Sequence, residues 1–263
     1  VQTCSLPIFL HNGVENFPEA LAACRTFRSL GGRIILISNS PRPSPGVIAQ
    51  LEALGVGPDC YDGIVTSGDV TVELVRQRGR VPLFHLGPKR DESIFHGLDL
   101  NFVTPDEARL VVCTGLFEDE TETAEDYREL LSCLAARNVP MICGNPDKWV
   151  EKGDRLIPCA GLLAEMYEAM GQQVTYAGKP YASIYELAVA KAGPVEKYEI
   201  LAIGDGIHTD IAGAVAQGIE AVFVASGVHV GPAGSGPLTE EAVAALFSNS
   251  DYRPIAAIPR LAW

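Results

Sequence analysis

The residues of this sequence best suited to chemistry lie in Glu199–Asp210, which reads EILAIGDGIHTD. The apolar run that begins at Ile200 ends at glycine, and this pattern predicts a buried strand. Asp205 and Asp210 follow it, in the loop at the carboxyl edge of a sheet where open α/β folds bind ligands. Two carboxylates there offer hard oxygen ligands suited to Mg²⁺. The alternative is a structural turn in which Asp210 is the N-cap of the next helix. The pattern allows both roles.

Two further loops carry polar residues directly after predicted strands. Ser38 and Asn39 follow an apolar run at 33–37, and Lys179 lies in a Gly-Lys-Pro turn after a short strand at 174–177. Each loop alone is explained by a turn serine or a solvated lysine. Together with the two carboxylates, they form a set suited to phosphate plus Mg²⁺, because hydroxyl and amide groups bind phosphoryl oxygens while lysine and metal neutralise charge.

The order of predicted elements indicates an α/β fold. Predicted strands at 33–37, 63–66 and 81–86 alternate with predicted helices, a spacing that favours βαβ units and a mostly parallel sheet. We therefore predict a doubly wound parallel sheet with an inserted α/β domain. The core domain is expected at 9–86 plus 174–263, and the insertion at 87–173.

Composition narrows the class of partner. The 263 residues are 47% apolar and 20% charged, which is typical of a globular protein. The formal charge of −13 argues against a nucleic-acid or membrane partner. No apolar run approaches the ~20 residues that span a bilayer, and no signal-like segment opens the chain. The seven cysteines contain no Cys-x-x-Cys pair. We therefore expect buried reduced thiols and a cytoplasmic protein.

With these motifs in this order, the chain resembles the haloacid dehalogenase (HAD) superfamily of phosphohydrolases. Within it, the chain is most similar to the NagD-like subfamily (class IIA), which has a large cap inserted between the second and third motifs. Ser38 matches the second-motif hydroxyl residue, Lys179 the third-motif lysine, and Asp205 and Asp210 the fourth-motif acids. Asn145-Pro146-Asp147 resembles a tripeptide typical of the subfamily.

The resemblance implies a Mg²⁺-dependent phosphatase that hydrolyses small phosphorylated metabolites through a phospho-aspartyl intermediate. It implies that Asp205 ligates Mg²⁺, while Asp210 assists it or orients Lys179. Ser38, the Asn39 backbone and Lys179 would hold the phosphoryl group. The residues expected to choose the leaving group are Asn145, Asp147 and Arg42. A homodimer formed through the caps is expected by analogy alone.

The first motif departs from the family pattern. Family members carry a nucleophilic aspartate at the end of the first strand, but that slot holds Ser5 here, and the slot of the second acid holds Pro7. A serine near its free pKa is a weak nucleophile, and proline carries no proton. Residues 1–8, VQTCSLPI, resemble a translated sequencing adapter, and we interpret them as foreign. The competing interpretation is a genuine, divergent first strand. The chain as written is expected to be inactive.

Two other functions fit parts of the sequence. A non-catalytic protein that binds phosphorylated metabolites would keep the fold without the nucleophile. A Rossmann-type nucleotide-binding domain is the third hypothesis, but no Gly-x-Gly-x-x-Gly follows an early strand.

Overall fold

A computed structural model describes residues 10–11, 15–152, 155–225 and 238–262. The described chain divides into two compact units. Unit 1 comprises Ser38–Val47 and Thr66–Gly178. Unit 2 comprises the segment that ends at Ile37, Ile48–Val65, and the chain from Lys179 onward. The predicted insertion, 87–173, falls within unit 1.

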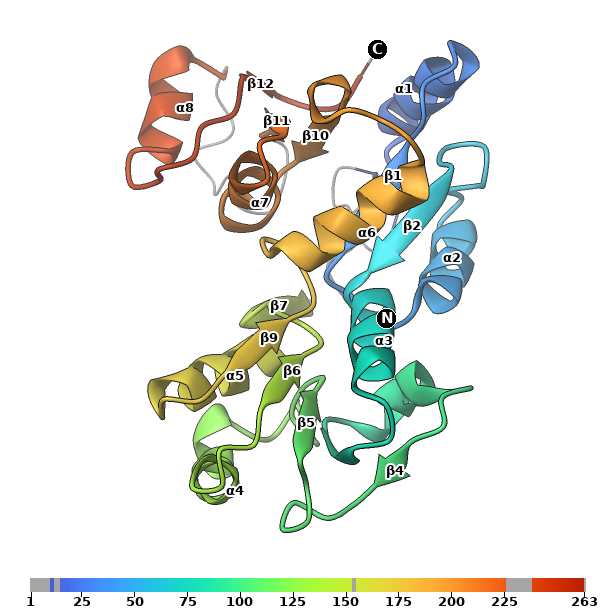
Figure 1. Ribbon diagram of the computed structural model, residues 1–263. Helices are drawn as coiled ribbons and strands as arrows, with labels where there is room; N and C mark the ends of the chain where they lie inside the picture. Colours follow the sequence, from blue (N-terminus) through green and yellow to red (C-terminus); the bar gives the residue numbers. More distant parts are fainter. Residues whose placement is uncertain (1–9, 12–14, 153–154, 226–237, 263) are drawn as a thin grey trace. The chain divides into compact units, whose positions relative to one another are not determined.

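Unit 1 contains a five-stranded parallel sheet (Figure 1). In order across the sheet, its strands are β4 (Asn101–Phe102), β3 (Pro82–Leu86), β5 (Leu110–Cys113), β6 (Met141–Cys143) and β9 (Val174–Tyr176). The chain moves outward from β3 to β4, then returns to the other side of β3 to form β5. The strand order therefore reverses between β3 and β5, which is the position where doubly wound sheets bind ligands at their carboxyl ends.

Helices cover both faces of this sheet, and β5 shows why. Its residues alternate between faces with the period of two that a strand imposes. Leu110 and Val112 pack with Val75, in a cluster that also takes residues from η1. Val111 and Cys113 belong to the opposite cluster, with α4 and α5. The helices involved are α3 (Ser67–Arg78), η1 (Lys89–Phe95), η2 (Ala124–Tyr127), α4 (Arg128–Ala135) and α5 (Ala160–Ala169).

An antiparallel hairpin follows the loop after β6. It pairs β7 (Trp149–Lys152) with β8 (Arg155–Pro158), and Trp149 lies opposite Pro158. No strand was predicted here from the sequence, so this hairpin is an addition to the predicted fold.

Unit 2 contains a three-stranded parallel sheet of β10 (Leu201–Gly204), β11 (Glu220–Val224) and β12 (Ala256–Ile258). A two-stranded sheet pairs β1 (Ile35–Ser38) with β2 (Gly63–Thr66), and both strands end where the chain enters unit 1. The rings of Phe223 and Phe247 meet edge to face at 5.3 Å in the core. The remaining elements are α1 (Pro18–Ser29), α2 (Ser44–Ala53), α6 (Ala182–Ala192), η3 (Lys197–Glu199), η4 (Ile207–Ile211), α7 (Ala212–Ala216) and α8 (Glu240–Leu246).

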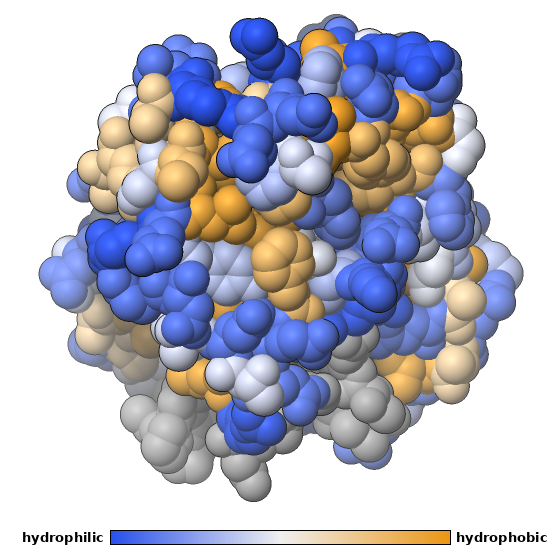
Figure 2. All heavy atoms as spheres, turned by 90° about the horizontal axis from the view of Figure 1, so that it is seen from below, coloured by the Kyte–Doolittle hydropathy of each residue, from blue (hydrophilic) through white to orange (hydrophobic). Residues whose placement is uncertain are grey.

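The predicted fold class, a doubly wound parallel α/β sheet, is confirmed. The suspected foreign segment and the first strand lie outside the described residues. Figure 2 shows a face on which hydrophilic residues predominate and hydrophobic residues form small patches. None of the helices in the described ranges is both long and apolar enough to cross a membrane.

Gly161 provides a test of how α5 packs. A Cβ at Gly161 would lie 2.2 Å from the backbone oxygen of Pro146 and 2.6 Å from that of Asp147. Because backbone cannot move aside cheaply, we expect Gly161→Ala to lower the free energy of unfolding by about 1–3 kcal/mol. Gly46 in α2 has no atom within 4 Å of an added Cβ, so Gly46→Ala should cause no loss. Urea denaturation measures both, and equal effects would contradict the packing argument.

Candidate active site

The loop after β10 brings Asp210 back against the end of the strand. A Cβ at Gly204 would lie 2.4 Å from both Cβ and Cγ of Asp210, so only glycine fits there. Asp205, the next residue, is buried with 5% of its surface exposed. The Gly-Asp-Gly sequence after this strand thus permits a close approach between the strand end and the second carboxylate.

Asp210 uses both carboxylate oxygens within the protein. Lys179 Nζ lies 2.9 Å from Oδ1, in an ion pair whose side chains are 8% and 17% exposed. The Gly206 N–H donates to Oδ2 at 3.1 Å, and the Thr209 hydroxyl lies 3.4 Å from the same oxygen. A buried ammonium requires such a partner, since an uncompensated buried charge is strongly destabilising. Asp210 is therefore placed to orient Lys179.

Asp210 is not the N-cap of the following helix, so that alternative from the sequence is wrong. It lies inside η4, a single π-helical turn, and α7 begins only at Ala212. The carboxylate still accepts a backbone N–H, but the donor is Gly206, which precedes it in the chain.

Tyr185 of α6 supports this turn and was missed by the sequence analysis. Its hydroxyl lies 3.2 Å from the carbonyl oxygens of both Thr209 and Asp210, and it donates to them. Burial, and secondarily the charge of Asp210, raise the pKa of Tyr185, so the hydroxyl keeps its proton. The only signal in the sequence was the position of Tyr185 six residues after Lys179.

Ser38 and Asn39 lie in unit 1, in a loop whose turns are held by side chains. The buried Ser38 Oγ accepts the N–H of Ser40 at 3.1 Å, and Ser40 Oγ accepts the N–H of Arg42 at 3.3 Å. The N–H of Gly68, in the first turn of α3, donates to the Ser40 carbonyl oxygen at 3.1 Å. The loop at the end of β1 is thus fastened to the start of α3.

The carboxylate of Asp69 links the start of α3 to the start of α2. One oxygen accepts the N–H of Thr66 at 3.0 Å, in a reciprocal capping box at the start of α3. The other accepts the N–H of Ser44 at 2.9 Å, at the first residue of α2. One carboxylate therefore serves the starts of two helices.

The predicted specificity residues Asn145 and Asp147 lie beside Asn39. The Asn39 amide Nδ2 donates to Asp147 Oδ1 at 2.9 Å, and Asn145 Oδ1 accepts the N–H of Asp147 at 3.1 Å. Unit 1 therefore joins the second-motif loop to the Asn-Pro-Asp tripeptide. The third-motif lysine and both fourth-motif acids belong to unit 2.

A buried polar cluster that the sequence analysis missed lies at the carboxyl ends of β3 and β5. Asp91 is 5% exposed, accepts a hydrogen bond from the Thr114 side chain, and interacts with the charges of Arg90 and Arg42. Burial raises the pKa of Asp91 to about 6. His85 Nε2 lies 2.9 Å from Thr114 Oγ1, and burial lowers its pKa to about 4. The cluster marks the strand-order reversal of this sheet.

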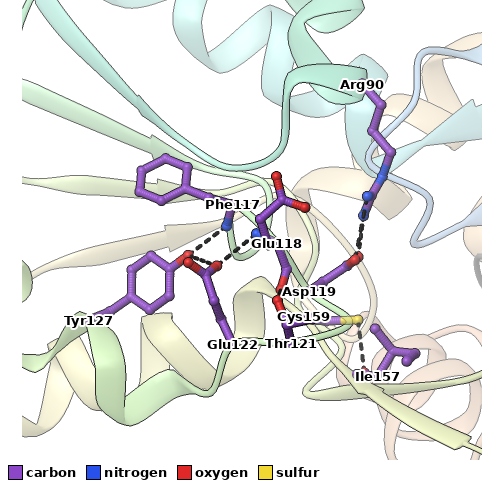
Figure 3. Close-up of polar contacts among 9 residues, drawn as sticks. All are labelled: Arg90, Phe117, Glu118, Asp119, Thr121, Glu122, Tyr127, Ile157 and Cys159. Carbon is purple, nitrogen blue, oxygen red and sulfur yellow. Dashed lines mark hydrogen bonds and ion pairs between the residues drawn. The ribbon is translucent and has the colours of Figure 1, made fainter.

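The acidic loop after β5 folds on itself (Figure 3). The Tyr127 hydroxyl donates to Glu122 at 2.6 Å and accepts the Phe117 N–H at 2.6 Å. Glu122 also accepts the N–H of Glu118 at 2.7 Å, and Arg90 pairs with Asp119. A cavity of about 370 Å³ lies between this loop and the β7–β8 hairpin.

The carboxylates of the candidate site are the candidate ligands for a metal ion. Among the residues described, no three or more His, Cys, Asp or Glu side chains gather in a way that could hold a metal. Mg²⁺ needs less, since it is commonly bound by one or two carboxylates together with waters and phosphate oxygens. Asp205, buried at the end of β10, fits that requirement.

The chain is similar to known hydrolases in both sequence and structure. The family described as haloacid dehalogenase-like hydrolase matches residues 9–101, and a second HAD-like hydrolase family matches residues 176–245. A crystal structure of a hydrolase of the haloacid dehalogenase-like family from Brucella suis 1330 is 46% identical, with a TM-score of 0.81. The alignment covers 96% of this chain and 92% of that one. The chain therefore belongs to the haloacid dehalogenase-like family of hydrolases.

Curated relatives narrow the assignment to the NagD-like subfamily, class IIA. The 5'-nucleotidase YutF of Bacillus subtilis is 26% identical over 83% of this chain and 84% of its own length. The ribonucleotide monophosphatase NagD of Escherichia coli K12 is 25% identical over 84% of this chain and 85% of its own. The resemblance predicted from the motifs is thus confirmed.

The Lys179–Asp210 pair can be measured by a double-mutant cycle. Asp210→Ala leaves the buried ammonium without this carboxylate, so we expect a loss of about 3 kcal/mol in the free energy of unfolding. Lys179→Met with Asp210→Ala should cost less than the sum of the two single changes, because no uncompensated charge remains. Urea denaturation of the four proteins gives the coupling, and strict additivity would contradict a buried pair.

Asp91 should make stability depend on pH. In the folded protein the pKa of Asp91 is about 6, above its usual value, so folding favours the protonated side chain. Its contribution to the free energy of unfolding is therefore complete below about pH 4 and is lost as pH rises through about 6. Asp91→Asn cannot ionise. The difference in free energy of unfolding between the Asp91→Asn variant and the unchanged protein should therefore shift in favour of the variant by on the order of 2 kcal/mol between about pH 4 and pH 8. Urea midpoints across this range measure it. The exposed neighbour Glu92, changed to Gln, is the control, and the same rise there would refute burial as the cause.

Proposed function

We propose that the natural protein, with an aspartate in the first motif, is a phosphoric monoester hydrolase that uses Mg²⁺ and acts on small phosphorylated metabolites. The observations that carry the proposal are the buried Lys179–Asp210 pair and the burial of Asp205 directly after β10. Membership of a hydrolase family whose named relatives are phosphatases supports it.

In this proposal each described residue has a physical role. Lys179 supplies the positive charge that a phosphoryl group needs, and Asp210 keeps its ammonium in place. The hydroxyl of Ser38 and the backbone N–H of Asn39 bind phosphoryl oxygens. Asp205 would hold Mg²⁺, which when bound neutralises charge on the phosphate. Positioning and electrostatics of this kind account for most of phosphoryl-transfer catalysis.

The nucleophile is the missing part. The slots held by Ser5 and Pro7 lie outside the described residues, and neither side chain suits the aspartate chemistry of the family. We propose that an aspartate in the first slot would form the phospho-aspartyl intermediate. The chain as written then binds phosphate esters without turning them over.

The remaining expectations complete the proposal. The segment 87–173 acts as the cap that restricts substrates to small molecules, and Arg42 together with Asn145 contacts the leaving group. A homodimer, the absence of a nucleic-acid or membrane partner, and a cytoplasmic location also belong to it. In support of that location, every cysteine in the described part of the chain is a free thiol.

A second candidate is a protein that only binds phosphorylated metabolites. The sequence favours it in one respect: the nucleophile slot holds a serine, while every other proposed phosphate-binding residue is present. The two candidates differ in whether residues 1–8 are native.

Release of phosphate from an aryl phosphate in the presence of Mg²⁺ tests the function. Two proteins are compared: the unchanged chain, and one carrying Ser5→Asp with the rest of residues 1–8 rebuilt as an apolar strand. We expect turnover in the rebuilt protein alone, reduced at least about a hundredfold by Asp205→Ala because the metal ligand is lost.

Circular dichroism establishes that the rebuilt protein is folded. A folded rebuilt protein that releases no phosphate, yet binds inorganic phosphate with Mg²⁺, favours the binding protein. One that does neither would refute both candidates.

A further inference from the structure

The side chain of Asp147, in the loop after β6, is hydrogen-bonded to the loop at the end of β1, which also belongs to unit 1. Its Oδ1 accepts the Asn39 amide at 2.9 Å, across 108 positions of sequence, and Asn39 is 1% exposed. We propose that Asp147 is a positioning residue, whose carboxylate holds the Asn39 carboxamide and thereby keeps the loop at the end of β1 in its phosphate-binding conformation. The inference rests on the proposed function, and it replaces the leaving-group role that the sequence suggested for Asp147.

Asp147 is itself firmly supported. Its N–H donates to Asn145 Oδ1 at 3.1 Å, and its carbonyl oxygen accepts the N–H of Gly161 at 3.1 Å, at the start of α5. Because Gly161 has no Cβ, the helix approaches this backbone closely. A carboxylate anchored both to the β6 loop and to a helix is well placed to orient the side chain of Asn39.

The carboxamide of Asn39 is confined on its other side as well. A Cβ at Gly178 would lie 2.6 Å from Asn39 Oδ1 and 2.3 Å from Ser67 Oγ, so the backbone after β9 packs against the carboxamide. The Asn39 side chain is therefore held by a hydrogen bond on one side and by backbone on the other. Fixing its χ angles restricts the backbone of Asn39, whose N–H is a proposed phosphate donor.

Electrostatics also favours this role over direct substrate contact. A carboxylate facing a phosphate ester would repel it, since both are anionic at neutral pH. The neutral amide of Asn39 instead donates a charge-assisted hydrogen bond to the carboxylate of Asp147. The negative charge is thus used to orient a neutral group.

Binding of inorganic phosphate separates the two roles, because this ligand has no leaving group. The full, unchanged chain is titrated with phosphate by calorimetry in the presence of Mg²⁺. We expect Asp147→Leu to weaken binding about tenfold, because the loop loses a charge-assisted hydrogen bond. Asp147→Asn keeps an acceptor oxygen and should stay within about threefold of the unchanged chain. Asp106→Ala, at an exposed acid of the same unit, is the charge control and should leave binding unchanged.

A pH profile adds a readout that a general loss of stability would not reproduce. Asn39→Asp sets two carboxylates against each other, and a single shared proton restores a hydrogen bond between them. Phosphate binding by Asn39→Asp should therefore be weak near neutral pH and recover as the pH falls. No such recovery is expected for Asp147→Leu.

The outcomes are distinct. Phosphate affinity that Asp147→Leu leaves unchanged would overturn the inference. If the unchanged chain binds no phosphate with Mg²⁺, the proposed function fails, and the phosphate part of this inference fails with it. The bond is then judged by urea midpoints of Asn39→Ala, Asp147→Ala and the double variant. A double variant whose shift equals the sum of the single shifts shows that Asp147 does not hold Asn39.

Discussion

The buried ammonium of Lys179 must have a carboxylate beside it, and much of the geometry after β10 follows from that requirement. An unpaired charge in this position would cost several kcal/mol, which is a large part of the stability of a domain. Asp210 satisfies it, but only because Gly204 has no Cβ in the path of the carboxylate. The turn that carries Asp210 is stabilised in turn by the Tyr185 hydroxyl. The end of β10, the π turn η4 and helix α6 thus all help to position the Lys179–Asp210 ion pair.

Unit 1 follows the same rule with different residues. Three carboxylates near the carboxyl ends of its strands are each hydrogen-bonded to another segment, and a buried polar group left without a partner would be destabilising. Asp69 joins the starts of α2 and α3, Asp147 joins the loops after β1 and β6, and Asp91 bonds to Thr114 between β3 and β5. These side chains tie separate loops together, and a fixed arrangement of loops is what binding a small anion demands.

The fold class could be predicted because it depends on local patterns. Strand 63–66 has the predicted bounds, since its short apolar run leads directly into a capped helix. The β7–β8 hairpin was missed, although the Gly153-Asp154 dipeptide between two short runs is a hairpin signal. The hydrogen bonds of Asp147 and Asp91 could not be predicted, because each needs a partner brought close only by the folding of distant segments.

The candidate site shows the same division between local and distant information. Lys179, Asp205 and Asp210 could be proposed as site residues because motif residues follow strands in a recognisable order. The N-cap role considered for Asp210 was wrong because the turn after β10 is π-helical, which places the carboxylate beside the preceding glycines. Nothing in single-residue preferences distinguishes that turn from an ordinary helix start. Tyr185 was missed because a tyrosine on an apolar helix face is usually core, and only its contact with two carbonyl oxygens shows its use.

The charges of the proposed site imply that phosphate and a metal ion should bind cooperatively. The chain carries a formal charge of −13, and the one lysine proposed to meet phosphate is already paired with Asp210. A phosphate dianion therefore approaches a site with no net positive charge, within a negative protein. A cation at Asp205 would reverse this locally, so each ligand should raise the affinity of the other by the same factor. That coupling needs no nucleophile. Under the proposed function, loss of the first-motif aspartate would remove turnover and leave a metal-dependent phosphate-binding protein. The two candidate functions would then differ by a single chemical step.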